Sequence, residues 1–176
     1  MTFRILSWLA AAALSCSVGV TNAQQQTKTT TALPDEVIAQ MSDTCAPPTD
    51  DSRGLVPQHY SLDDARSGDL WLAVCNVGAY QTTYEVIYQA DDAAPRKLLF
   101  AQWRNGSWTG TDVLYDPSFD PDTGVLTDQY KDRGAGGCGG ERTWQWENGY
   151  FRLTEYRAAE ACNHNVSELP VIFEAE

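Results

Sequence analysis

The hydrophobic pattern of the chain changes near residue 70, from a short helical period to strand-like runs. Residues 34–41 place their apolar side chains on one face after a proline and two acids, which predicts a short helix. Residues 70–75 form a continuous apolar run, typical of a strand that is buried on both faces. Residues 84–88 and 98–103 follow, rich in aromatic side chains, and predict further strands.

Three turn signals join these runs into hairpins. Asn105-Gly106 and Asn148-Gly149 predict two-residue hairpin turns, and residues 120–124 (Asp-Pro-Asp-Thr-Gly) predict a longer loop. The two-residue turns set the cross-strand pairs Trp103–Trp108, Trp146–Phe151 and Trp144–Leu153. Short strands at this spacing, with no helical stretch between them, predict an all-β domain: an antiparallel sandwich or small barrel with one short N-terminal helix. Trp144 and Trp146 share a face, and we predict that both lie in the core.

The first residues have the pattern of a secretory leader. Arg4 precedes an apolar core over residues 5–14, and small residues at Thr21 and Ala23 fit a cleavage site before Gln24. The apolar core is shorter than the ~20 residues that a spanning helix needs. We therefore expect a signal peptide over residues 1–23 and an exported protein, without a transmembrane segment after the leader.

A cysteine within the leader and a polar stretch after it add to this organisation of the N-terminal part of the chain. Cys16 follows Ala13-Leu14-Ser15, so a lipid anchor at Cys16 is the alternative processing. Residues 24–33 are polar and repetitive, which predicts a flexible tether. Residues 34–176 are then expected to form a single domain, large enough for a hydrophobic core.

The charge of the chain limits its partners. Twelve Lys and Arg face 24 Asp and Glu, a formal net charge of −12. Nucleic acid binding relies on neutralising phosphates with cations, so we exclude nucleic acid as a partner. A cationic protein partner fits the charge, and solubility alone is the simpler reading of it.

Four cysteines remain after the leader, an even number that predicts two disulfides in an exported chain. Three connectivities are possible, and we predict Cys45–Cys75 and Cys138–Cys162 because each pair is close in sequence. No C-x-x-C is present, so neither a redox-active pair nor a thiolate zinc site is indicated.

The most unusual stretch is residues 131–140, where five glycines surround Cys138 after two cations. Such a loop can present backbone N–H groups to an anion, with the cations beside it. The candidate ligand-binding residues are Lys131, Arg133, Gly134, Gly136 and Gly137. In the alternative interpretation the glycines let two strands approach closely around the disulfide, and Lys131 and Arg133 pair with neighbouring aspartates. The pattern G-x-G-x-x-G is also present, but a strand-like run follows it instead of a helix, so a dinucleotide site is rejected.

Two common catalytic motifs are absent from the sequence. There is no H-E-x-x-H and no G-x-S-x-G, and disulfide formation removes the cysteines as nucleophiles. Six aspartates lie between residues 112 and 132, and we predict that they form turns and are solvated: Asp112, Asp116, Asp120, Asp122, Asp128 and Asp132. We assign no catalytic residue, metal or cofactor.

From Gly68 onward the chain resembles DUF1176, a family of bacterial exported proteins of unknown function. The resemblance rests on residues 70–75 followed by Gly78-Ala79-Tyr80, on residues 131–139, and on a short C-terminal set: Trp144-Gln145-Trp146, Phe151-Arg152-Leu153 and Cys162. Asp132, Gly137 and Gln81 depart from the usual family pattern. Family members are generally about twice as long, so the chain resembles their C-terminal half. The resemblance implies an exported, disulfide-bonded domain and brings no activity.

These features together predict a periplasmic binding or interaction module that is a monomer. Its partner is expected to be a cationic envelope protein, as for a lysozyme inhibitor, or a small anionic ligand at the glycine loop. The alternatives are an envelope hydrolase that uses acidic residues and a purely structural envelope protein.

Overall fold

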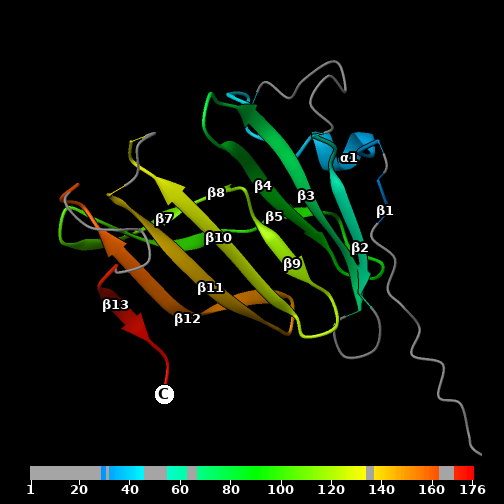
Figure 1. The fold of residues 1–176 in the computed structure, drawn as a ribbon. Coiled ribbons are helices and arrows are strands. Elements are labelled where there is room, and N and C mark those ends of the chain that lie inside the picture. Colours follow the sequence, from blue (N-terminus) through cyan, green and yellow to red (C-terminus); the bar gives the residue numbers. More distant parts are fainter. Residues whose placement is uncertain (1–28, 31, 46–54, 63–66, 134–136, 163–168) are drawn as a thin grey trace, which may run out of the picture.

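The computed structural model is a two-layer sandwich of antiparallel β-sheets (Figure 1). It describes residues 29–30, 32–45, 55–62, 67–133, 137–162 and 169–176. The all-β architecture with one short helix is therefore confirmed, and it is a sandwich. In the described part of the chain, no helix is long and apolar enough to cross a membrane.

The first sheet is built around β3 and β4, the long strands of the first half of the chain. Its order is β1-β2-β3-β4-β5, with β8 paired to the other half of β4. The bounds are β1 Thr29–Thr30, β2 Gln58–Leu62, β3 Gly68–Val77, β4 Thr82–Gln89, β5 Arg96–Lys97 and β8 Val113–Tyr115. β1 falls within the stretch predicted to be a tether and pairs with β2.

The second sheet has the order β13-β12-β11-β10-β9. Its bounds are β13 Val171–Glu174, β12 Tyr150–Ala159, β11 Gly139–Glu147, β10 Val125–Lys131 and β9 Ser118–Asp120. A separate ribbon of β6 (Phe100–Arg104) and β7 (Ser107–Thr111) packs near β12, since the Trp103 backbone N–H donates to the Tyr156 hydroxyl at 3.2 Å.

The main core lies between the two sheets. It is formed by inward-facing apolar side chains of both sheets, among them Leu70, Leu72, Val86, Leu126, Trp144 and Trp146. Trp144 and Trp146 are both buried, as predicted from their alternation along one strand. Aromatic edge-to-face contacts fill the space, such as Tyr88 on Trp146 with ring centres 4.8 Å apart.

A second, smaller core covers the outer face of the first sheet. The helix α1 (Asp35–Ile38) buries Val37 against Trp71, Ala73 and Ile87. This packing explains why the β3 sequence is continuously apolar. One face of the strand meets the second sheet, and the other meets α1 with its flanking residues, which we call the α1 segment (residues 33–45).

The predicted hairpins and disulfides are confirmed. Trp103 pairs with Trp108, Trp146 with Phe151 and Trp144 with Leu153. Both residues of each Asn-Gly turn have positive φ, as in Asn105 (51°) and Gly106 (70°), which matches the twist of a tight hairpin. The disulfides are Cys45–Cys75 and Cys138–Cys162.

Candidate functional site

The glycine-rich loop between β10 and β11 is held by the disulfide Cys138–Cys162. Gly137 has a φ of 84°, a conformation that glycine adopts without steric cost. Gly134 and Gly136 lie outside the described residues. Of the predicted ligand-binding residues, the structure therefore describes Lys131, Arg133 and Gly137.

Two neighbouring glycines allow β10 and β11 to approach closely. A Cβ atom at Gly139 would lie 2.1 Å from the Tyr130 carbonyl oxygen, and one at Gly140 would lie 2.6 Å from the Tyr130 ring. Neither position has room for a side chain. This part of the loop therefore matches the alternative interpretation, in which the glycines let two strands approach near the disulfide.

The two cations of the loop do not pair with aspartates in the described part of the chain. Arg133 donates from Nη2 to the Cys162 carbonyl oxygen at 3.3 Å. Asp132, which lies between the two cations, instead forms a 2.8 Å ion pair with Arg104 on β6. The Lys131 ammonium is exposed and has no hydrogen bond or ion pair with any described residue.

Gln81 brings the β3–β4 turn to this loop. Its Nε2 donates to the Gln129 carbonyl oxygen at 2.6 Å, and its Oε1 accepts from the Lys131 N–H at 2.7 Å. The side-chain amide thereby takes the place of a strand beside β10, beyond the residues that pair with β9. Tyr80, which directly precedes Gln81 in the turn, is 75% exposed. The turn at residues 78–81 and Lys131 therefore lie side by side, and they come from two stretches that contribute to the family resemblance.

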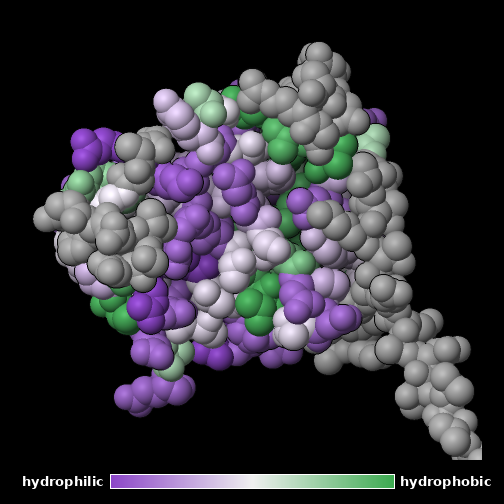
Figure 2. Space-filling view, viewed as in Figure 1, coloured by the Kyte–Doolittle hydropathy of each residue, from purple (hydrophilic) through white to green (hydrophobic). Residues whose placement is uncertain are grey.

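The outer face of the second sheet has an open hollow of about 310 Å³. Its lining is polar: Asp116, Thr127, Asp128, Gln129, Glu141, Arg142 and Thr143. Gln129 and Glu141 bond to each other across β10 and β11, with Nε2 and Oε1 2.6 Å apart. Figure 2 shows that this face is largely hydrophilic. The lining contains no aromatic platform, which a sugar-binding face usually supplies.

Asp128 and Arg142 form an ion pair inside the sandwich, and both side chains are 0% exposed. Arg142 Nε donates to Asp128 Oδ1 at 2.8 Å, and Arg142 Nη2 donates to Oδ2. Burial raises the pKa of Asp128, and the hydrogen bonds from Arg142 act against that rise. The prediction that Asp128 is a solvated turn residue is therefore wrong, because its strand position faces the core.

Arg142 Nη1 has no hydrogen-bond partner among the described residues. The guanidinium carbon lies 5.2 Å from the Trp144 ring centre and 5.3 Å from that of Tyr130. Aromatic faces therefore surround the cation and offset part of its desolvation. This environment indicates a structural ion pair, because a reacting group needs access to substrate.

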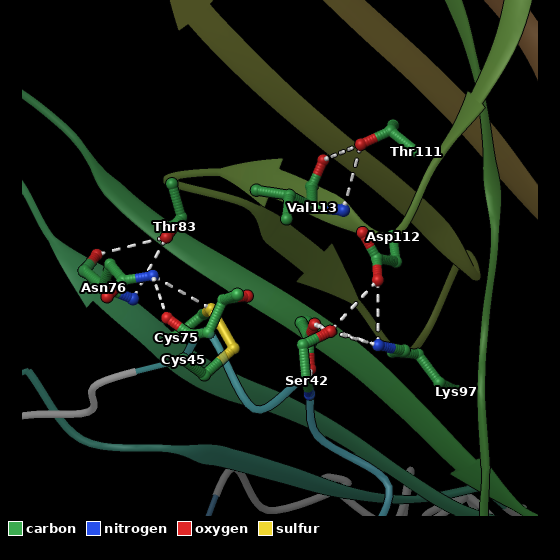
Figure 3. Close-up of a disulfide and its surroundings, with 11 residues drawn as sticks. Ser42, Cys45, Cys75, Asn76, Thr83, Lys97, Thr111, Asp112 and Val113 are labelled. Carbon is green, nitrogen blue, oxygen red and sulfur yellow. Dashed lines mark hydrogen bonds and ion pairs between the residues drawn. A yellow bond between two sulfur atoms is a disulfide. The ribbon is translucent and has the colours of Figure 1, made fainter.

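A second polar cluster lies under the α1 segment, beside the disulfide Cys45–Cys75 (Figure 3). Ser42 Oγ lies 2.5 Å from Lys97 Nζ and donates to Glu85 Oε1 at 2.5 Å. Lys97 Nζ also contacts Glu85 Oε1 at 3.1 Å and Asp112 Oδ2 at 2.8 Å. A serine beside a lysine is the arrangement of a Ser–Lys nucleophile pair, so this cluster is the strongest catalytic candidate in the described chain.

The charge state of Lys97 argues against catalysis by this cluster. Burial lowers the pKa of Lys97, but hydrogen bonds to Asp112 and Glu85 outweigh it and raise the pKa above its ordinary value. A general base must be neutral, whereas Lys97 is an ammonium that donates its three N–H bonds to Ser42, Glu85 and Asp112. The cluster therefore ties the end of the α1 segment to β4 and β5.

The sulfurs of the neighbouring disulfide and a Glu85 oxygen lie within 4.8 Å of one another. Metal binding by cysteine requires thiolates, and these two sulfurs are bonded to each other. Asn76 Nδ2 donates to Cys75 Sγ at 3.2 Å. The group thus anchors the loop after α1 to β3 and is not a metal centre in the oxidised state.

An exposed apolar surface lies where the β6–β7 ribbon meets β13. Trp108 is 45% exposed, Phe173 37% and Val171 46%. The Trp108 ring packs edge-on against Phe173, with centres 6.2 Å apart, and against Trp103 at 5.3 Å. We call Trp108, Val171 and Phe173 the rim. It gathers large apolar side chains from distant parts of the sequence at one end of the sandwich.

Sequence reasoning missed both the rim and the Ser42 cluster. The run Val171-Ile172-Phe173 after Pro170 was a strand signal, but it did not reveal that this strand lies at an edge. Ser42 contacts residues 43 and 70 positions away, and no local motif encodes such distances. Glu85 was hidden within an apolar strand whose outer face is covered by the α1 segment.

Among the comparisons with known proteins, a match to one protein family identifies the chain. No curated protein and no solved structure matches the chain. The family described as "Protein of unknown function (DUF1176)" matches residues 10–173, which is wider than the stretch from Gly68 that suggested it. The chain therefore belongs to the DUF1176 family.

Proposed function

We propose that this protein is a binding module, exported to the bacterial periplasm, that captures a cationic envelope protein such as a lysozyme. The leader pattern supports export, and the net charge of −12 supports a cationic partner. The protein itself performs no catalysis in this proposal.

The observation that carries the proposal is that most described cations already have a carboxylate partner within the protein, whereas several exposed acids have none among the described residues. Ion pairs with its own carboxylates already engage most cations of the described chain: Lys97, Arg104, Arg142, Arg152 and Arg157. Exposed acids such as Glu36, Glu174 and Glu176 have no ion-pair partner among the described residues. A cationic protein supplies these missing counter-charges, which speeds encounter and favours such partners over anionic ones.

The side chains that could catalyse hydrolysis are engaged in ion pairs, which does not favour the hydrolase alternative. Lys97 is held as an ammonium by two carboxylates, and Asp128 is closed off from solvent by its pairing with Arg142. A glycosidase needs two accessible carboxyl groups with separated pKa values. The polar hollow contains Asp116 and Glu141, and the Glu141 carboxylate is already engaged by Gln129 Nε2 at 2.6 Å.

Titration of the mature protein with hen lysozyme, as a cationic probe, tests the proposal. We expect a stoichiometric complex at an ionic strength of about 0.05 M that weakens by at least tenfold at about 0.5 M. A panel of cationic envelope proteins gives the same test for other partners. Absence of a complex with every cationic protein at low salt would overturn the proposal, as would turnover of cell-wall fragments that one Asp or Glu substitution abolishes. A purely structural envelope protein shows neither binding nor turnover.

A small anionic ligand at Lys131 and Arg133 is the second candidate function. The specific support is the exposed Lys131 ammonium, which has no partner among the described residues. Two-dimensional NMR titration with inorganic phosphate or acetate tests it, by comparing wild type with Lys131→Ala/Arg133→Ala. Shifts near Lys131 that the double variant loses support the site, and identical titrations remove it.

A further inference from the structure

β13 is the outermost strand of the second sheet, and its far edge faces no described strand. The Ala175 N–H donates to the Thr154 carbonyl at 2.9 Å, and the Pro170 carbonyl accepts from the Ala158 N–H at 3.0 Å. The N–H and C=O of a trans peptide unit point in opposite directions. The Val171 N–H and the Glu174 C=O therefore point away from β12, toward an edge that no described strand covers.

The side chains along this edge are apolar on the face toward the core. Phe173 lies opposite Tyr156 on β12, and its ring contacts Trp108. Both rim aromatics remain partly exposed, so the inner face of the sheet continues to an uncovered boundary. Figure 2 shows hydrophobic residues at the surface around β13, at the lower left of the view. An added strand would bury this apolar area.

The opposite face of the edge is acidic. Glu174 lies directly across from Glu155, a like-charge pair that is unfavourable in an antiparallel sheet. Arg157 neutralises Glu155, with Nε and Oε1 2.5 Å apart. Glu174 has no ion-pair partner in the described chain. A neighbouring strand with a basic residue at this position would complete the pattern of charges.

We propose that β13 accepts an additional strand from the cationic partner protein. The strand is an extended segment of alternating apolar and basic residues, with its apolar side chains on Phe173 and Trp108 and a basic side chain beside Glu174. Main-chain hydrogen bonds at the edge supply affinity, and the two faces supply specificity. A second copy of this chain fits less well because each copy has a net charge of −12. The inference rests on the proposed capture of a cationic protein and assigns the surface that performs it.

A synthetic peptide probes the edge directly. The probe is an end-blocked, fluorescein-labelled peptide of about ten residues that alternates lysine and valine. Controls are the same peptide with glutamate for lysine, and the lysine peptide with N-methyl groups on alternate amides. Anisotropy is expected to show saturable binding of the unmodified lysine peptide and at least tenfold weaker binding of both controls. Equal binding of the N-methylated peptide would overturn strand addition.

Substitutions on the protein locate the site. Val171→Pro removes the outward N–H, which pairs with no described strand, and proline is tolerated on an edge strand. Glu174→Lys reverses the facing charge. Each is expected to weaken peptide binding about tenfold or more. Val171→Ala and Glu36→Lys are the matched controls, and both should stay within about threefold of wild type. Glu36 lies on α1, on the outer face of the other sheet. Circular dichroism confirms that each variant is folded.

Parallel titrations with hen lysozyme separate this inference from the proposed function. Weakened lysozyme binding by Val171→Pro and Glu174→Lys supports both. Lysozyme binding that is equal in wild type and these variants overturns the β13 site and leaves capture intact. Peptide binding at β13 without any complex with a cationic protein keeps the edge site and overturns capture. A concentration-dependent dimer in sedimentation, lost in Val171→Pro, would assign the edge to a second copy instead.

Discussion

Arg142 on β11 lies directly opposite Asp128 on β10, and the two form a bidentate ion pair between the sheets. Asp128 Oδ2 also accepts the Tyr115 backbone N–H of β8 at 3.0 Å. β8 pairs with β4 of the first sheet, so this carboxylate joins the two sheets. The ion pair therefore lies at a polar link between the two sheets.

Removing one partner of this pair is expected to destabilise the protein strongly. Asp128→Ala leaves the Arg142 cation buried without a counter-charge and should lower the free energy of unfolding by about 3–5 kcal/mol. Asp128→Leu/Arg142→Met replaces both charges with apolar groups and should be closer to wild type than the single variant. Urea denaturation checks both. A loss below about 1 kcal/mol in Asp128→Ala would contradict a structural role.

The contrast between Asp128 and Asp120 shows which part of the fold the sequence predicts. Asp120 lies at a turn, where its carboxylate accepts the Asp122 N–H at 3.0 Å, as the residues 120–124 indicated. Asp128 has the same side chain, but its position in β10 turns it into the core. Local chemistry sets the turn, whereas the burial of Asp128 depends on Arg142, 14 residues away. The hairpins, the core tryptophans and the disulfides were predictable because neighbouring residues or simple pairing rules determine them.

The surfaces that carry the proposals were much less predictable. Trp103 and Trp108 were correctly paired by the Asn-Gly turn, but pairing does not say which ring is exposed. The exposure of Trp108 follows from the position of the β6–β7 ribbon at the end of the sandwich, beside β13. Long-range packing decides this position, and a single sequence carries no local signal for it.

Ser42→Ala tests whether the Ser42 cluster is structural. The variant removes the hydroxyl that accepts from Lys97 and donates to Glu85, and we expect a loss of about 1–3 kcal/mol in the free energy of unfolding. Because Lys97 is protonated, a fluorophosphonate probe should not label Ser42 in the wild type. Mass spectrometry checks the labelling, and modification of Ser42 in the folded protein would contradict the structural assignment.

The same cluster predicts the pH dependence of stability. The hydrogen bond from Lys97, set against burial, holds the pKa of Asp112 below its ordinary value of 3.8. A carboxyl with a depressed folded pKa contributes stability above the unfolded value, and this contribution is lost as the pH falls through the folded pKa. Lys97 has a raised pKa, so its contribution is complete below its ordinary value of 10.5 and is lost as the pH rises through the folded pKa.

Asp112→Asn should therefore flatten the acid side of the stability profile. Urea midpoints of wild type and Asp112→Asn, measured between about pH 2 and pH 7, should differ at neutral pH and converge toward pH 2. Asp35→Asn on α1 is the control, since the Asp35 side chain is exposed. A constant difference between wild type and Asp112→Asn over this range would contradict the assigned role of Lys97.

The side chain of Gln81 is expected to hold the start of the glycine loop in position. Its amide bonds the Gln129 carbonyl and the Lys131 N–H, so Gln81→Ala should free this part of β10 and cost about 1–2 kcal/mol. Gln81→Glu keeps the acceptor for the Lys131 N–H but loses the donor to Gln129, so it should retain more of the local order. Amide hydrogen exchange at Lys131 distinguishes the two variants: protection should fall in Gln81→Ala and persist in Gln81→Glu. Unchanged protection in Gln81→Ala would mean that the disulfide Cys138–Cys162 and the strand pairing with β11 suffice to hold Lys131 in place.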